Sequence, residues 1–495
     1  MRIVMLCMII FALVLGACSS SGTSSSSATS PSGENNSEDE IPPAPNNQRN
    51  ENVNQPAEGI AMDPWDIPAR EEALDIDTQG QFIIETWRDL EYLSENLANN
   101  EENPPTYVVT DDITFPTIEN DQLNEPYVRN GGFTPIGNAE APFTGSFFGN
   151  NHVINNLKIT GSDDDGLGLF GVVDIITIEN LRLHNSDIEG AGPLGTLIGR
   201  SNEQIRISNV SVTESKIRGH SRIGGLIGYM NRSNVSSHII SSTFSGEISG
   251  NALVGGLVGL SEVNSRIRES GVTINIRERD QQAAPFESIG GLIGKLDGNN
   301  NTIINAYAKI EMNLPQNIVG GLIGIFEGTN NSIQSSYVSG SITGRNNVGG
   351  LIGIFRGSNN SIEDSYASGT INGGSAVGGL VGLFVGAGPN TPQNSILRSY
   401  TNVEVSGDLN ILSIGALIGQ INDGNTNIRN VYWNGQRAAQ SIGINDIRNN
   451  GQIVETSAID NISTDEFSDF TSTTNNGPWI LTPGEWPQLS WQVEQ

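Results

Sequence analysis

The sequence predicts an all-β fold, a parallel β-helix or β-solenoid of about ten coils. The first observation is a hexapeptide, Ile/Val-Gly-Gly-Leu-Ile/Val-Gly, that recurs through most of the chain. The second is its spacing, which is 29 to 31 residues where the array is most regular. A fixed period of this length is typical of a stacked array, in which each unit buries its apolar face against its neighbours. The full copies end at Gly228, Gly259, Gly294, Gly324, Gly353 and Gly382.

The composition of each unit favours strands over helix. Three glycines in six residues would each cost about 1 kcal/mol in a helix interior, whereas the surrounding Val, Ile, Tyr and Thr favour strands. Turn signals such as Gly-Asn-Asn and Ser-Gly predict two or three strands in each unit. Gly224 and Gly228 have the spacing of a membrane-helix dimer motif, but polar residues lie too close for a membrane span. No copy has the Gly-Lys-Ser/Thr or Gly-x-Gly-x-x-Gly context of a phosphate-binding loop.

The repeats are expected to occupy residues 143–433, with a cap at each end. Looser copies end at Gly149, Gly171 and Gly199, and an Ala variant ends at Gly419. Because the first and last coils of a solenoid expose unpaired strand edges, something must cover them. Residues 74–142 are expected to form the N-terminal cap. Residues 434–495, which break the period, are expected to form a C-terminal cap over the last coil.

Each expected cap has its own sequence signal. In the N-terminal cap, residues Thr86 to Ala98 are predicted to form one amphipathic helix, with Trp87, Leu90, Leu93 and Leu97 on one face. Thr86 and Asp89 have the spacing of a capping box. The C-terminal segment is instead rich in large aromatic side chains. These are Phe467, Phe470, Trp479, Trp486 and Trp491.

The N-terminus is predicted to be a secretion signal followed by a tether. Residues 1–17 combine a positive start at Arg2 with an apolar core that is too short to span a membrane. Leu-Gly-Ala-Cys, ending at Cys18, resembles the bacterial lipobox, which implies a lipoprotein whose Cys18 carries diacylglycerol and an N-linked acyl chain. The alternative is an ordinary signal peptide cut near Ala17. Residues 18–73, rich in Ser, Asn and Pro, are predicted to be a disordered tether.

The charge and the cysteine content limit the classes of partner that can be expected and indicate the cellular compartment. With 55 acidic and 25 basic residues the net charge is −30, which argues against nucleic acid or anionic lipid as a partner. The second cysteine, Cys7, lies in the segment that would be removed, so the mature chain has no intrachain disulfide. Ser19, directly after Cys18, resembles the outer-membrane sorting signal of enterobacterial lipoproteins. The lipid on Cys18 would make the membrane a partner, at the outer membrane of a bacterial envelope.

The repeat itself resembles a known family. One copy, Val348 to Gly369, contains Val-Gly-Gly-Leu-Ile-Gly followed by Asn-Ser-Ile-Glu-Asp-Ser-Tyr-Ala-Ser-Gly. This pattern is similar to the GLUG repeat of bacterial cell-surface proteins, including adhesin-like ones, and the resemblance covers Phe143 to Trp433. It implies a β-solenoid scaffold at the cell surface. It is specific for the scaffold and says little about activity.

Two rows of like residues follow from the period. Register stacking would place one tyrosine of each of five units in a ladder, which would either bind glycan by ring stacking or hold the coils together. A second row consists of the pairs Asn300-Asn301, Asn330-Asn331 and Asn359-Asn360, whose amides suit turns and bonds between coils. The tyrosines are Tyr307, Tyr337, Tyr366, Tyr400 and Tyr432.

The sequence offers no identifiable catalytic constellation. Its four histidines, His152, His184, His220 and His238, are scattered among units, and no His-Glu-x-x-His or Gly-x-Ser-x-Gly motif occurs. Asp163-Asp164-Asp165 supplies oxygen ligands but lacks the nonapeptide of calcium β-rolls. We therefore expect no cofactor and no metal site.

Three functions remain at this stage. The first is a lipid-anchored cell-surface protein that serves adhesion or scaffolding through an extended repeat face, with a glycan or a surface protein as its ligand. The second is a carbohydrate-active β-helix enzyme, a polysaccharide lyase or hydrolase, which would need clustered carboxylates with a basic residue. The third is a structural envelope component without a ligand.

Overall fold

The computed structural model describes most of the chain from residue 63 onward. The signal segment, Cys18 and most of the predicted tether lie outside the described residues. The described residues are 63–97, 103–117, 127, 131–161, 165–231, 236–279, 288–315, 317–388, 390–407, 413–422, 426–435, 440, 442–446, 452–453, 456–459, 467, 469–470 and 477–492.

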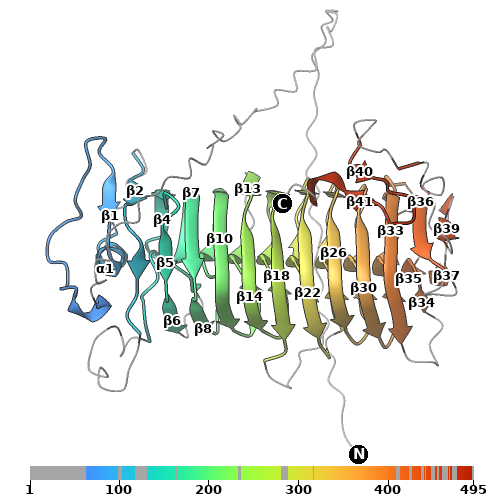
Figure 1. Cartoon of the computed structure of the whole chain (residues 1–495), viewed down its shortest axis with the longest axis horizontal. Helices are drawn as coiled ribbons and strands as arrows, with labels where there is room; N and C mark the ends of the chain where they lie inside the picture. The colour runs from blue at the N-terminus through green and yellow to red at the C-terminus, as the bar shows by residue number, and fades with distance from the viewer. Residues whose placement is uncertain are drawn as a thin grey trace, which may run out of the picture. The chain divides into compact units, whose positions relative to one another are not determined.

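The predicted β-solenoid is confirmed, with about nine turns, and Figure 1 shows its coils side by side along the long axis. A regular coil has four short strands, β27 (Asn347–Gly349), β28 (Ile352–Phe355), β29 (Ser361–Glu363) and β30 (Tyr366–Gly373). The prediction of two or three strands was wrong because the glycine pair turns the chain within the hexapeptide. A Cβ atom on Gly349 would overlap the carbonyl oxygen of Ile352, so only glycine permits this close return.

The strands of successive coils form parallel ladders. The strand that follows the glycine pair recurs as β9 (Ile198–Ser201), β12 (Ile227–Met230), β16 (Val258–Ser261), β20 (Ile293–Asp297), β24 (Ile323–Glu327), β28, β32 (Val381–Val385), β35 (Ile418–Asn422) and β37 (Ile442–Asp446). The strand before it forms a separate seven-stranded sheet of β11 (Ser221–Gly224), β15 (Ala252–Gly255), β19 (Ser288–Gly290), β23 (Ile318–Gly320), β27, β31 (Val377–Gly378) and β34 (Ile414–Gly415).

Two further ladders complete each coil, and in four coils a single long strand serves both. The long strands are β7 (Phe170–His184), β10 (Ile205–Arg218) and β33 (Asn394–Gly407), and β36 (Thr426–Asn434) follows the same course. The third ladder also contains β13 (Ser236–Ile240), β17 (Asn264–Arg268), β21 (Thr302–Ile304), β25 (Ser332–Gln334), β29 and β38 (Gln452–Ile453). The fourth also contains β6 (Lys158–Gly161), β8 (Asp187–Gly190), β14 (Thr243–Ser249), β18 (Gly271–Arg277), β22 (Tyr307–Asn313), β26 (Tyr337–Thr343), β30 and β39 (Thr456–Ile459).

The interior is filled by stacks of like side chains. Ile333, Ile362 and Ile396 occupy one register position on adjacent coils, and each is fully buried. Phe326 and Phe355 occupy another, with ring centroids 5.3 Å apart. Because adjacent coils present the same residue type at the same position, one packing solution repeats along the stack.

At the N-terminal end the predicted helix forms and closes the core. Helix α1 spans Trp87–Glu95, shorter than predicted, and buries Trp87, Leu90 and Leu93 in the same apolar core as the coils. The first strands are β1 (Phe82–Ile84), β2 (Thr106–Val109), β3 (Ile113–Thr114), β4 (Phe143–Phe148) and β5 (Val153–Asn155). Figure 1 shows α1 and β1 at this end.

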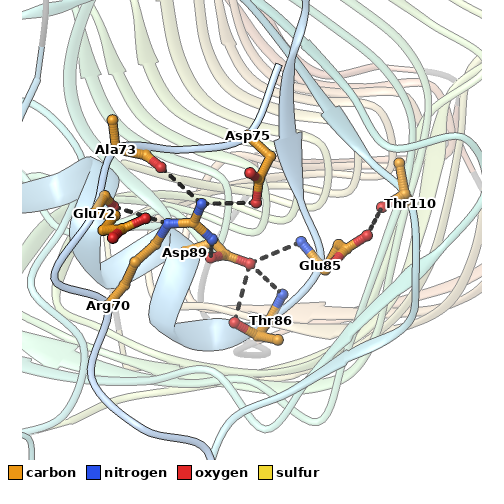
Figure 2. Close-up of polar contacts among 8 residues, drawn as sticks. All are labelled: Arg70, Glu72, Ala73, Asp75, Glu85, Thr86, Asp89 and Thr110. Carbon is orange, nitrogen blue, oxygen red and sulfur yellow. Dashed lines mark hydrogen bonds and ion pairs between the residues drawn. The ribbon is translucent and has the colours of Figure 1, made fainter. Parts of the chain in front are cut away.

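A polar cluster holds the start of α1 in place (Figure 2). The buried Asp89 carboxylate accepts hydrogen bonds from the backbone N–H groups of Glu85 and Thr86, at 3.0 and 2.8 Å, and pairs with Arg70 at 2.7 Å. Arg70 lies in the predicted tether, as does Trp65, whose ring packs edge-on against Trp87 at 6.3 Å. The prediction of a tether over 18–73 therefore ran too far, since residues 63–73 are anchored to the cap.

The C-terminal end differs more from expectation. The strands β37, β38 and β39 continue the ladders past Trp433, so the stack is longer than the predicted 143–433. The aromatic segment does not lie over the last coil; it turns back along the side of the stack, as Figure 1 shows in red. We call the described residues of this segment, 467, 469–470 and 477–492, the C-terminal strap. It contains the two-stranded antiparallel sheet of β40 (Trp479–Ile480) and β41 (Gln488–Leu489), and 3-10 turns occur at Pro64–Asp66 and Ser490–Gln492. Across the described part of the chain, no helix has the length and apolar character needed to cross a membrane.

Candidate functional site

The five predicted tyrosines do form a ladder. Tyr307, Tyr337, Tyr366, Tyr400 and Tyr432 occupy one register position on five successive coils. The rings of Tyr337 and Tyr366 stack with centroids 5.3 Å apart and an interplanar angle of 9°. The faces of these tyrosine rings therefore contact the rings of the neighbouring tyrosines.

The C-terminal strap covers this ladder, which favours the second of the two alternatives, a row of tyrosines that holds the coils together. Trp491 packs against Tyr307 and Tyr337, and Trp486 stacks on Tyr400 at 5.0 Å. The Tyr400 hydroxyl donates to the carbonyl oxygen of Pro487 at 2.6 Å. The side chains of Tyr337, Tyr366, Tyr400 and Tyr432 are buried, and none of these residues is more than 9% exposed. Together with the strap these four tyrosines form a buried apolar cluster, against which the partly buried Tyr307 packs.

The asparagine rows also serve the scaffold. The amide oxygens of Asn331 and Asn360 accept from the backbone N–H groups of Asn301 and Asn331, at 2.8 and 2.9 Å. Beside this buried row, Asn300, Asn330 and Asn359 have φ values of 55° to 61° and bond to one another across coils. Asparagine adopts this left-handed turn conformation more readily than most residues. The asparagine amide groups therefore form hydrogen bonds that hold adjacent coils together.

The remaining predicted polar residues do not converge. His152 contacts Asp112, and His184 contacts Thr213, in different places. Asp163 and Asp164 lie outside the described residues, as does Cys18. Among the residues that the structure describes, no group of three or more His, Cys, Asp or Glu side chains could hold a metal ion.

Sequence reasoning missed a recurrent pairing of cations with carboxylates on neighbouring coils. Arg218 bonds Asp187 at 2.7 Å and Glu189 at 3.1 Å, one coil earlier. Arg398 does the same with Glu363 and Asp364, both at 2.9 Å. Such pairs combine the charges that the enzyme hypothesis requires, but each carboxylate here is already bonded to an arginine. A third set consists of Lys295, Glu327 and Arg356.

One row of basic side chains lacks such carboxylate partners, and sequence reasoning missed it as well. Arg206 on β10, His238 on β13 and Arg266 on β17 occupy the same outward position on three successive coils. Both arginines are exposed and His238 is half-buried. Burial, and then the two neighbouring guanidinium groups, lower the pKa of His238 below its ordinary value. Within the described part of the chain, no carboxylate lies within ion-pair distance of Arg206 or Arg266.

The same outward position continues with small hydroxyl side chains. After Arg266 the register passes to Thr302, Ser332, Ser361 and Ser395 on the next four coils. All four are partly exposed, in contrast to the covered tyrosines. We call the row from Arg206 to Ser395 the display row. It could be recognised only once the register of the coils was known.

Comparison with known proteins places these features in context but does not establish a family. No family model matches the sequence, so the likeness to GLUG repeats stays a resemblance. Over 157 residues the chain is 34% identical to Halomucin of Haloquadratum walsbyi (strain DSM 16790 / HBSQ001). That match covers 31% of this chain and 2% of the relative, so the chain spans a small fraction of that protein's length.

Two solved structures also resemble the chain. One is an IgA1 protease with 19% identity and a TM-score of 0.35, over 64% of this chain and 21% of that one. The other, from Bacteroides ovatus, is described as an immunoglobulin A1 protease. It has 15% identity and a TM-score of 0.33, over 84% of this chain and 94% of that one. Both likenesses are distant, and no activity of this chain follows from them.

Proposed function

We propose that this chain is a lipid-anchored cell-surface protein whose solenoid presents the display row for adhesion or scaffolding, without catalysis. The observation that carries the proposal is a contrast in exposure between two rows of side chains along the stack. The tyrosine row is covered by the strap, while the display row stays partly exposed over seven successive coils from Arg206 to Ser395. A stiff, repetitive and accessible face suits contact with an extended partner.

The polar chemistry supports a binding role over an enzymatic one. The carboxylates of Asp187, Glu189, Glu363 and Asp364 are each bonded to an arginine in this structure. Such pairs stabilise the coil-to-coil contact, whereas a general acid or base must be free to exchange its proton with a substrate.

The anchor at Cys18 belongs to the same proposal and rests on the sequence Leu15 to Cys18. A Cys18→Ser variant should lose labelled lipid and leave the membrane fraction, while Cys7→Ser, in the removed segment, should behave as the unaltered protein. Equal lipid labelling and fractionation of Cys18→Ser would refute the anchor.

The binding role is tested with the full chain on an array of glycans and matrix proteins, run beside an activity screen on neutral and acidic polysaccharides. We expect retention on at least one ligand class and no change in polysaccharide chain length. Depolymerisation of any polysaccharide would favour the lyase or hydrolase hypothesis. Neither retention nor depolymerisation would leave the structural envelope role.

A further inference from the structure

We infer that Arg206, His238 and Arg266 bind an acidic polysaccharide, whose carboxylate or sulfate groups lie along the display row. This inference rests on the proposed binding function and names the ligand class. It begins from the geometry of the row. The three side chains stand on β10, β13 and β17 in direct register, so they repeat at the spacing of paired strands, about 4.8 Å.

Arg206 and Arg266 flank His238 from the coils on either side, and the display row contains no carboxylate. At Arg218 and Arg398, by contrast, a carboxylate stands on the adjacent coil, Glu189 and Asp364 respectively. A chain with 55 acidic side chains has ample means to neutralise this row too. Among the described residues, however, neither Arg206 nor Arg266 has an ion-pair partner or a side-chain hydrogen bond.

The neighbourhood extends the positive character without cancelling it. Arg268 stands two residues after Arg266 on the same outward side of β17, is exposed, and likewise pairs with no described carboxylate. The nearby Glu269 carboxylate accepts a hydrogen bond from the Ser241 hydroxyl at 3.1 Å, so it is directed at the turn. An external anion is therefore the available counter-charge for the row.

The shape of the site favours a polysaccharide over other polyanions. Basic side chains occupy only three or four positions on three coils, and the rest of the display row consists of hydroxyls such as Thr302 and Ser332. Hydroxyls can donate to and accept from the hydroxyl groups of sugars. Nucleic acids carry a phosphate on every nucleotide and gain their affinity by neutralising many of them, which a patch of three or four basic side chains cannot do. A linear glycan with acidic groups at intervals suits a short cationic patch that continues into a neutral polar row.

The test compares two double variants of the full chain that change the charge equally. Arg206→Ser with Arg266→Thr introduces residue types that the same row already carries at Ser332 and Thr302, so the coils should fold as before. The control, Arg277→Ser with Arg345→Ser, removes two exposed arginines at other positions. Binding is measured by calorimetry with polygalacturonate for carboxylates, dextran sulfate for sulfates, neutral dextran, and a single-stranded oligonucleotide.

We expect the unaltered chain and the control to bind one or both acidic polysaccharides, and the display-row variant to bind about ten-fold more weakly or not at all, because charge-assisted hydrogen bonds are lost. Neutral dextran should bind equally weakly to all three. A gain-of-binding variant, Thr302→Arg, should tighten binding severalfold because it extends the cationic row by one coil.

Other outcomes would overturn the inference in recognisable ways. Equal losses in the display-row variant and the control would show a diffuse charge effect. Tighter binding of the oligonucleotide than of both acidic polysaccharides would assign the row to nucleic acid. If the acidic polysaccharides fail but another glycan or a matrix protein binds, this inference fails and the proposed function stands. If the full chain binds nothing, both fail.

Discussion

The phenol rings of Tyr366 and Tyr400 stack almost in parallel, with centroids 4.8 Å apart and an interplanar angle of 4°. This separation equals the distance between paired strands, so the rings are in contact without tilting. The stack is then closed from outside by the strap, whose Trp479 lies 6.3 and 5.8 Å from the two rings. A contact between adjacent coils thereby becomes the docking surface for a segment about a hundred residues further along the chain.

Substituting Trp479 should release the C-terminal strap while leaving the coils folded. The side chain is fully buried, stacks on Phe470 at 4.8 Å, and donates to Asp364 at 3.0 Å. Trp479→Ala should cost the docked state about 3 kcal/mol or more, as for other buried aromatic truncations. Limited proteolysis should then cut the strap much faster, with little change in far-ultraviolet circular dichroism. Glu485→Ala, an exposed change in the same strap, is the control, and equal cleavage of both variants would contradict the assignment.

Alkaline pH should loosen the same cluster. Burial raises the pKa of Tyr366 to about 12, with a smaller opposing effect from its hydrogen bond to Gln492. A raised pKa means that the folded state favours the protonated phenol, so this stabilisation is complete below the ordinary pKa of 10 and is lost as the pH rises toward 12.

Chemical denaturation of the protein at a series of pH values should therefore show the free energy of unfolding falling above pH 10. Tyr366→Phe should make that fall smaller. It should not abolish it, since burial also raises the pKa of Tyr107 to about 12. A slope that is unchanged by Tyr366→Phe would exclude this residue as a source.

The glycine pairs should be intolerant of side chains. A Cβ atom on Gly350 would overlap the carbonyl oxygen of Gly379 on the next coil and lie 2.7 Å from the Cβ atom of Ala367. Gly350→Val should destabilise the fold by about 3 kcal/mol or more, at or beyond the upper end of ordinary overpacking. Gly388→Val is the matched control, because the nearest atom to a Cβ atom at Gly388 would be 3.7 Å away. Thermal denaturation compares the two, and equal midpoints would mean that the coils are not closely packed at Gly350.

Loss of Asp89 should open the N-terminal end of the solenoid. Removing this carboxylate leaves Arg70 without one of its partners and two backbone N–H groups unsatisfied, which typically costs 3–5 kcal/mol for a buried pair. Asp89→Ala should therefore detach helix α1 and expose the first strands, which can pair with another molecule.

Size-exclusion chromatography with light scattering should show end-to-end association of the Asp89→Ala protein. Glu91→Ala, which removes only the partly exposed pair with Arg88, should stay at the size of the unaltered chain. If Asp89→Ala remains the same size and keeps its stability, α1 is not the element that protects this end.

The parts of the fold that could be predicted are those whose residues recur at regular intervals in the sequence. The glycine hexapeptide, the tyrosine row and the asparagine pairs recur at a near-constant interval, so the stacking of like residues follows from the period alone. The helix near Trp87 was predictable from a single amphipathic segment, although its end at Glu95 was not. In each case the evidence is local or periodic.

The features that were missed depend on long-range register. Trp491 donates to the carbonyl oxygen of Ser335, 156 positions earlier, and nothing periodic links them. The display row could not be recognised from the sequence for a related reason. The step from Arg206 to His238 is 32 residues, from His238 to Arg266 it is 28, and from Arg266 to Thr302 it is 36. Because turns of unequal length separate these strands, only the pairing of the coils reveals that the positions coincide.

The strap has a consequence for how this protein can evolve. Arrays of similar repeats readily gain or lose whole units by recombination, and coils without a strap contact should tolerate such events. Between Tyr307 and Tyr432, however, the strap meets particular coils, with Trp491 at Ser335 and Trp479 at Asp364. A unit gained or lost there would displace the strap from its partners by a whole coil. We therefore expect the number of coils between Tyr307 and Tyr432 to be constrained by the strap, and the number of coils before Tyr307 to be free of that constraint.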